Sequence, residues 1–88
     1  MKLRFYAIKD NVVGAFYNPT PLHNDEECKR AMREAMAGQS ELVNRAEDLS
    51  MYYLYTLDYE SGLIENNVPT FIGNLIDYKK VEDKNESN

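Results

Sequence analysis

One segment of this chain constrains the fold more than any other, because its apolar residues recur at helical spacing behind a recognisable start signal. The segment from Asp25 to Ala37 follows Asn24, a favourable N-cap, and Glu27 completes a capping-box pattern. Its apolar residues share one face, at Cys28, Ala31, Met32, Ala35 and Met36. Gly38 suits the position that follows a helix. A helix with a single apolar stripe must cover another layer, so the rest of the chain has to supply one.

The residues before this helix predict a β-hairpin. Leu3 to Lys9 alternates with aromatic and β-branched residues, and its period of two places Leu3, Phe5 and Ala7 on one face and Arg4, Tyr6 and Ile8 on the other. Asp10-Asn11 is turn chemistry, and Val12 to Tyr17 is predicted to return as the second strand. The prolines in Asn18–Pro21 are expected to end it.

The residues after the helix predict three more strands. Gln39 to Leu49 is read as a loop with one helical turn. Met51 to Asp58 is apolar or aromatic on both faces, which is typical of a central strand. A loop ending at Gly62 is expected to lead into a return strand at Leu63–Glu65. The last strand is predicted over Phe71–Tyr78, interrupted at Gly73-Asn74.

The predicted order is therefore β-β-α-β-β-β. This order indicates an α+β fold, with an antiparallel sheet of four to five strands and one amphipathic helix packed on one face. Residues 1–78 are expected to form a single domain. Residues 79–88 are expected to form a polar, flexible C-terminal tail.

The charge distribution argues against a strongly basic nucleic-acid binder. The chain has 88 residues and a formal net charge of −5, whereas such binders usually carry a basic footprint. Its N-terminal 23 residues differ from the whole, because Lys2, Arg4 and Lys9 face only one acidic residue, Asp10. Any phosphate-facing surface is expected near this segment.

The sequence gives no sign of catalysis, and we expect no enzyme activity, no metal and no cofactor. The one histidine, His23, stands in a predicted loop, and glycine-rich phosphate loops and nucleophile motifs are absent. The one cysteine, Cys28, cannot form an internal disulfide. It is read as a buried core residue, with a reactive thiolate at the helix N-terminus as the alternative.

The tyrosines are the most informative residues for function. There are seven, and six lie on or beside predicted strands. Aromatic rings on a sheet surface can stack on the bases of single-stranded nucleic acid, at about 1–3 kcal/mol per base. The candidate binding residues are Lys2, Arg4, Tyr6, Lys9, Tyr17, Tyr52, Tyr53 and Tyr55. Alternatively, the rings serve only as strand formers at a sheet edge or a dimer interface.

Several stretches resemble one protein family. They are Tyr6-x-Ile8-x-Asp10 followed by Ala15-Phe16 and Asn18-Pro19, then Asn24-Asp25 opening a helix with Arg30 and Ala35, then the run from Glu47 to Leu54 continuing to Gly62, and finally Ile72-Gly73-Asn74 with Ile76-Asp77. In this order they are similar to the small nonstructural protein of gokushoviruses, single-stranded DNA phages of the Microviridae, also known as the phage open-reading-frame-five protein. Tyr55 departs from the family, where a small residue is expected.

The resemblance implies a nonstructural protein that binds DNA during genome replication or packaging. The first hypothesis is single-stranded DNA binding through a tyrosine-bearing sheet face, in the host cytoplasm. The second is a non-enzymatic adaptor, a homodimer that engages a phage or host replication or assembly protein. No membrane association is expected, because no apolar stretch approaches bilayer length.

Overall fold

The sheet is built around two long strands that lie side by side. The computed structural model describes residues 1–66 and 68–79. Its elements in chain order are β1 (Lys2–Asp10), β2 (Ala15–Phe16), β3 (Thr20–Leu22), α1 (Asp25–Ala37), α2 (Glu41–Asn44), a 3-10 helix (Ala46–Asp48), β4 (Leu49–Asp58), β5 (Ile64–Glu65), β6 (Thr70–Asn74) and a second 3-10 helix (Leu75–Tyr78). Antiparallel β1 and β4 form the centre, β2 and β3 pair with the free edge of β1, and β5 and β6 pair with that of β4.

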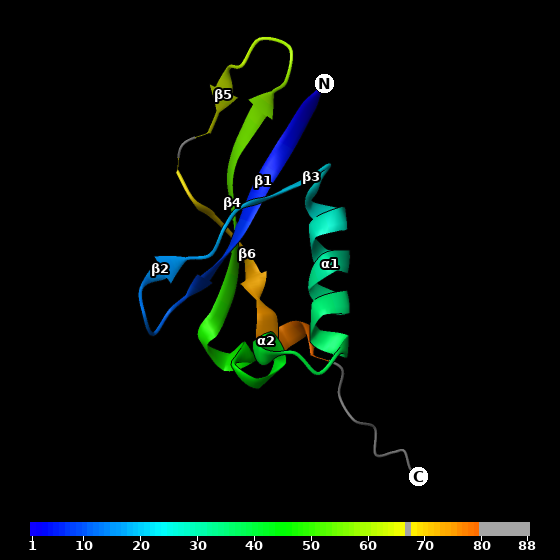
Figure 1. Ribbon diagram of the computed structural model, residues 1–88, viewed down its shortest axis with the longest axis vertical. Coiled ribbons are helices and arrows are strands. Elements are labelled where there is room, and N and C mark those ends of the chain that lie inside the picture. The colour runs from blue at the N-terminus through cyan, green and yellow to red at the C-terminus, as the bar shows by residue number, and fades with distance from the viewer. Residues whose placement is uncertain (67, 80–88) are drawn as a thin grey trace.

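The α+β prediction is confirmed, with six strands in place of four or five. The main helix, α1, lies against one face of the sheet, and the β4–β5 hairpin extends beyond the helix end (Figure 1). Among residues 1–66 and 68–79, the sheet therefore has one face that α1 covers over part of its length and one face without a helix.

The turn after β1 is longer than predicted. Val12 and Val13 do not extend a strand, because the buried carboxylate of Asp10 accepts hydrogen bonds from both of their backbone N–H groups. Gly14, at φ +83°, closes the turn by donating to the Asp10 carbonyl. Only Ala15 and Phe16 then pair with β1.

The strand β2 ends at Phe16, before Asn18 and Pro19 as expected, but a further strand that the sequence did not predict follows it and contains Pro21. Thr20, Pro21 and Leu22 form β3 and pair with Tyr6, Phe5 and Arg4. Proline is tolerated here because β3 is an edge strand. The N–H group that Pro21 lacks is therefore not needed for a hydrogen bond to a further strand.

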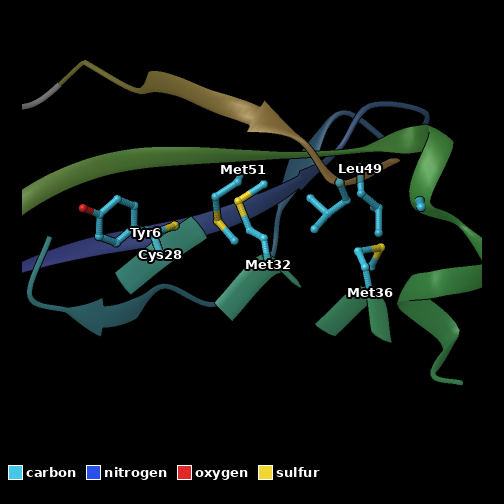
Figure 2. Close-up of a cluster of buried hydrophobic side chains, with 8 residues drawn as sticks. Tyr6, Cys28, Met32, Met36, Leu49 and Met51 are labelled. Carbon is cyan, nitrogen blue, oxygen red and sulfur yellow. The ribbon is translucent and has the colours of Figure 1, made fainter. Parts of the chain in front are cut away.

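The helix α1 begins as predicted, and its buried face supplies Cys28, Met32 and Met36, three of the eight residues of the buried core cluster. The side chain of Asn24 accepts a hydrogen bond from the Glu27 N–H at 2.8 Å. The Glu27 carboxylate reaches past the cap to the His23 N–H. Figure 2 shows the core side chains between α1 and the sheet: Tyr6, Cys28, Met32, Met36, Leu49 and Met51. Gly38 follows the helix in extended backbone, so it supplies no left-handed cap.

The chain after β6 differs from its prediction, because Leu75–Tyr78 is a 3-10 helix and the strand ends at Asn74. Leu75 is completely buried, and Ile76 and Tyr78 pack against the same core. These apolar residues contact α1 from the side, which a continued strand would not allow. The tail prediction falls largely on residues 80–88, which lie outside the described residues.

A β-bulge in β4 decides where its tyrosines point. Phe5 pairs with Tyr55, but Tyr6 pairs with Tyr53, so Leu54 is an extra residue in β4. In a regular strand Tyr53 and Tyr55 would share a face. Here Tyr53 packs against the core beside Tyr6, while Tyr55 stacks on Phe5 on the opposite face.

Candidate interaction face of the sheet

The sheet face opposite α1 carries a continuous set of apolar and aromatic side chains. We call it the open face. Alternation and cross-strand pairing place on it Leu3, Phe5, Ala7 and Lys9 of β1, Phe16 of β2, Tyr52, Tyr55 and Leu57 of β4, Ile64 of β5 and Phe71 of β6. Within the described residues, no helix covers this set (Figure 1).

One row of aromatic rings crosses the open face from edge to edge. The Tyr52 ring lies in the middle, with ring centroids 5.5 Å from Phe16 and 5.8 Å from Phe71, both at near-perpendicular angles. Phe16 and Phe71 are exposed, at 41% and 53%. Their contacts with Tyr52 hold the three rings in place while leaving the two outer rings accessible to a ligand.

A second aromatic pair lies farther along the same two strands. Phe5 and Tyr55 stack with centroids 4.9 Å apart and planes 18° from parallel. Between this pair and the row lies Ala7, a small residue that pairs with Tyr52 and is buried. The open face therefore presents two aromatic clusters separated by a shallow position.

The end of the open face near the β4–β5 hairpin is aliphatic. Leu3 pairs with Leu57, and Leu57 pairs with Ile64. Ile64 is 61% exposed, and the adjacent Leu63 is exposed as well. Exposed apolar residues that are contiguous in this way usually mark a binding surface.

The open face carries a single formal charge among its ladder residues. Lys9 lies at the end opposite the hairpin, with its Nζ 5.7 Å from the centroid of the Phe16 ring, within cation–π range. The other basic residues of β1 lie on the α1 side. There, Lys2 pairs with Glu65 at 2.7 Å and Arg4 pairs with Asp25 at 3.1 Å.

The structure divides six of the eight residues proposed from sequence between the two faces. Lys9, Tyr52 and Tyr55 lie on the open face, whereas Arg4, Tyr6 and Tyr53 lie together on the α1 side. Tyr6 is only 1% exposed, so its ring cannot stack on a base. The idea of one surface holding Arg4, Tyr6 and Tyr52 is therefore wrong.

Arg4, Tyr6 and Tyr53 fasten α1 to the sheet. The Arg4 guanidinium carbon lies 3.8 Å from the centroid of the Tyr53 ring, and its Nε donates to the Tyr6 hydroxyl. Burial, with the hydrogen bond to Asp25, raises the pKa of Tyr6. The remaining two candidates lie apart from both clusters: Lys2 is in its ion pair, and the Tyr17 hydroxyl accepts from Arg45.

Sequence reasoning missed three rings of the open face. Phe5, Phe16 and Phe71 complete the clusters around Tyr52 and Tyr55, but the residues predicted from sequence included only tyrosines among the aromatic types. For Phe5 a signal existed, because the alternation already grouped it with Leu3 and Ala7. For Phe16 and Phe71 the strand pairing was needed.

The two residues with reactive side chains have structural roles. Cys28 is completely buried, and burial raises the pKa of its thiol to about 11. This confirms the core reading and contradicts an activated thiolate, which needs a lowered pKa. The His23 Nδ1 lies 2.9 Å from Glu27, and the His23 backbone N–H also lowers the pKa of that carboxylate. Among the described residues, no three metal-ligating side chains cluster, and no helix has the length and apolarity to cross a bilayer.

Comparison with known proteins gives one match. A family model described as "Phage ORF5 protein" matches residues 3–78, which includes every strand of the open face. Neither a curated protein nor a solved structure matches the chain.

Proposed function

The chain belongs to the phage ORF5 protein family, and we propose that it binds single-stranded DNA through the open face during replication or packaging of a phage genome. The observation that carries the proposal is the pair of aromatic clusters on a sheet face that no other element of the described chain covers. The proposed role is binding without catalysis, in the cytoplasm of the host cell. The resemblance to the gokushovirus protein favours a single-stranded genome.

The geometry of the clusters suits bases better than it suits duplex DNA. Exposed rings on a four-stranded sheet stack two or three unpaired bases in well-known RNA-binding modules. Phe16 and Phe71 offer such rings at the two sides of the row, and Phe5 with Tyr55 offers a second position. Paired bases are hidden inside a duplex, so the proposal predicts a strong preference for single strands.

The charge on the open face determines how strongly the DNA affinity should depend on salt concentration. Lys9 is the one cation among the ladder residues, so stacking has to supply most of the affinity. For single strands, log K falls with log salt concentration by about 0.7 per phosphate contacted. We therefore expect a slope near −0.7 and only a weak loss of affinity at high salt.

The test is a fluorescence anisotropy titration with a labelled oligonucleotide, repeated over a range of salt concentrations. Phe71→Ala removes an exposed ring and should weaken binding by roughly 5-fold or more, since one stacked base is worth about 1–3 kcal/mol. Tyr59→Ala is the matched control, because Tyr59 is similarly exposed but lies in the hairpin loop. Equal affinity for duplex and single strands, or equal effects of the two variants, would contradict the proposal.

The open face also supports the second hypothesis, an adaptor that binds another protein, because a nearly uncharged apolar sheet surface suits a protein partner. An adaptor would bind no oligonucleotide at any salt concentration. It would lose its replication or assembly partner on the same Phe71→Ala substitution. The titration therefore separates the two candidates.

A further inference from the structure

The open face has the size of a protein–protein interface. β4 is ten residues long, which corresponds to ~33 Å of extended strand. Four neighbouring strand positions at ~4.8 Å spacing add a width of roughly 15–20 Å, so the face covers on the order of 600 Å². Two such faces bury about 1,200 Å² together, which is the lower bound for a specific interface.

The charges at the two ends of the open face are opposite. Lys9 lies at one end of β1, where it pairs with Ser50 of β4. At the other end, the hairpin loop that follows β4 carries Glu60, whose carboxylate lies 3.9 Å from the N-terminal ammonium of Met1 and whose side chain is 86% exposed, so it remains accessible to a partner. Between these ends the ladder residues of the face are uncharged. A second face laid over the first in the reverse direction would bring each lysine to a glutamate.

We propose that a second copy of this chain covers the open face, with the two sheets back to back and the two β4 strands antiparallel. Aligned sheets of this kind pack about 10 Å apart. Lys9 of each copy then meets Glu60 of the partner subunit, and the aliphatic end at Ile64 packs on the aromatic row of the other copy. Charge complementarity and buried area both select a copy of the chain itself.

The dimer hides the rings assigned above to DNA, so the two states exclude each other. This consequence rests on the proposed function, whereas the dimer rests only on the open face. At high protein concentration the rings are covered by the second copy. Binding of single-stranded DNA shifts the monomer–dimer equilibrium toward the monomer.

The test of the dimer is sedimentation velocity from low to high micromolar concentration. The wild type should show a reversible dimer. Ile64→Asp places a carboxylate against the aromatic row of the other copy and should raise the dimer dissociation constant at least about tenfold. Ile64 is exposed in the monomer, and a circular dichroism spectrum checks that the variant folds. A wild type that stays monomeric at every concentration would overturn the proposal.

A charge exchange tests the antiparallel arrangement. Lys9→Glu and Glu60→Lys should each weaken the dimer, and the double variant should restore it. Glu34→Lys, the same change on the exposed side of α1, is the control and should leave the dimer unchanged. A double variant no stronger than the single ones would contradict this arrangement.

Sedimentation velocity of the wild type with added oligonucleotide separates failure of the inference from failure of the function. If the dimer is the resting state, saturating single strands should convert it into complexes that contain one copy of the chain, because the dimer and the DNA complex use the same rings. Binding by a protein that is always monomeric overturns the dimer alone. A dimer that binds no DNA supports the inference and overturns the function.

Discussion

The Tyr6 hydroxyl donates a 2.6 Å hydrogen bond to Oδ1 of Asp25, which ties the middle of β1 to the first turn of α1. Tyr6→Phe keeps the buried ring and removes this bond together with the hydrogen bond that the hydroxyl accepts from Arg4 Nε. Hydrogen bonds to charged groups contribute about 1.5–3 kcal/mol, and because Asp25 is partly exposed we expect a loss near 1–2 kcal/mol in the free energy of unfolding. Urea denaturation measures it. The matched control is Tyr17→Phe, whose hydroxyl bonds Arg45 at the surface, where a loss below about 0.5 kcal/mol is expected. Equal losses would contradict the role of Tyr6.

Stability should decline in alkaline solution because of Cys28. Its pKa rises from 9.0 to about 11 on folding, so above pH 9 the unfolded chain releases the thiol proton more readily than the folded one. The stabilisation is complete below pH 9 and is lost as the pH rises through 11. Linkage over these two pKa units puts the loss at about 3 kcal/mol. The difference in unfolding free energy between wild type and Cys28→Ala, measured from pH 8 upward, should shrink over this range, and a constant difference would refute the prediction.

Gly73 and Gly38 should respond in opposite ways to alanine. A Cβ at Gly73 would lie 3.2 Å from Cε1 of Tyr78, which packs against the core, so Gly73→Ala should cost about 1–2 kcal/mol. At Gly38 nothing lies within 4 Å, and its φ of −93° suits any residue. Gly38→Ala should be neutral or stabilising by up to ~1 kcal/mol. Thermal melts of the two variants give the comparison, and a destabilised Gly38→Ala would count against it.

The N-cap of α1 gives a further test. Asn24→Ala removes the acceptor for the Glu27 N–H and should destabilise the fold by about 1 kcal/mol. Asn24→Ser keeps a capping oxygen and should stay within a few tenths of a kcal/mol of wild type. Chemical denaturation followed by circular dichroism would show the difference. If both variants lose the same stability, the cap does not support α1 as described.

Local patterns predicted the helix and the central strands because their signals lie within a few residues. Asn24 and the apolar spacing to Met36 located α1, and the two-sided apolar run located β4. The edge strand at Pro21 and the 3-10 helix at Leu75 were missed. Both depend on tertiary contacts, the first on a free sheet edge and the second on packing against α1.

The candidate site was only half predictable for a related reason. Alternation in β1 separated Phe5 from Tyr6 correctly, but it could not say which of the two faces α1 would cover. The cationic residues supplied the misleading clue. From the sequence, Arg4 was predicted to contact a ligand. In the structure its guanidinium pairs with Asp25 and lies over the Tyr53 ring of the same protomer.

The bulge at Leu54 decides which face each later residue of β4 occupies. If β4 kept Leu54 but paired with β1 without the bulge, regular alternation would turn Tyr55 and Leu57 toward the α1 side and Thr56 outward. Loss of Leu54 itself would leave these residues on their present faces, because Tyr53 and Tyr55 would then be neighbours in a regular strand. A single extra residue therefore determines the chemical character of the outer surface over the second half of β4.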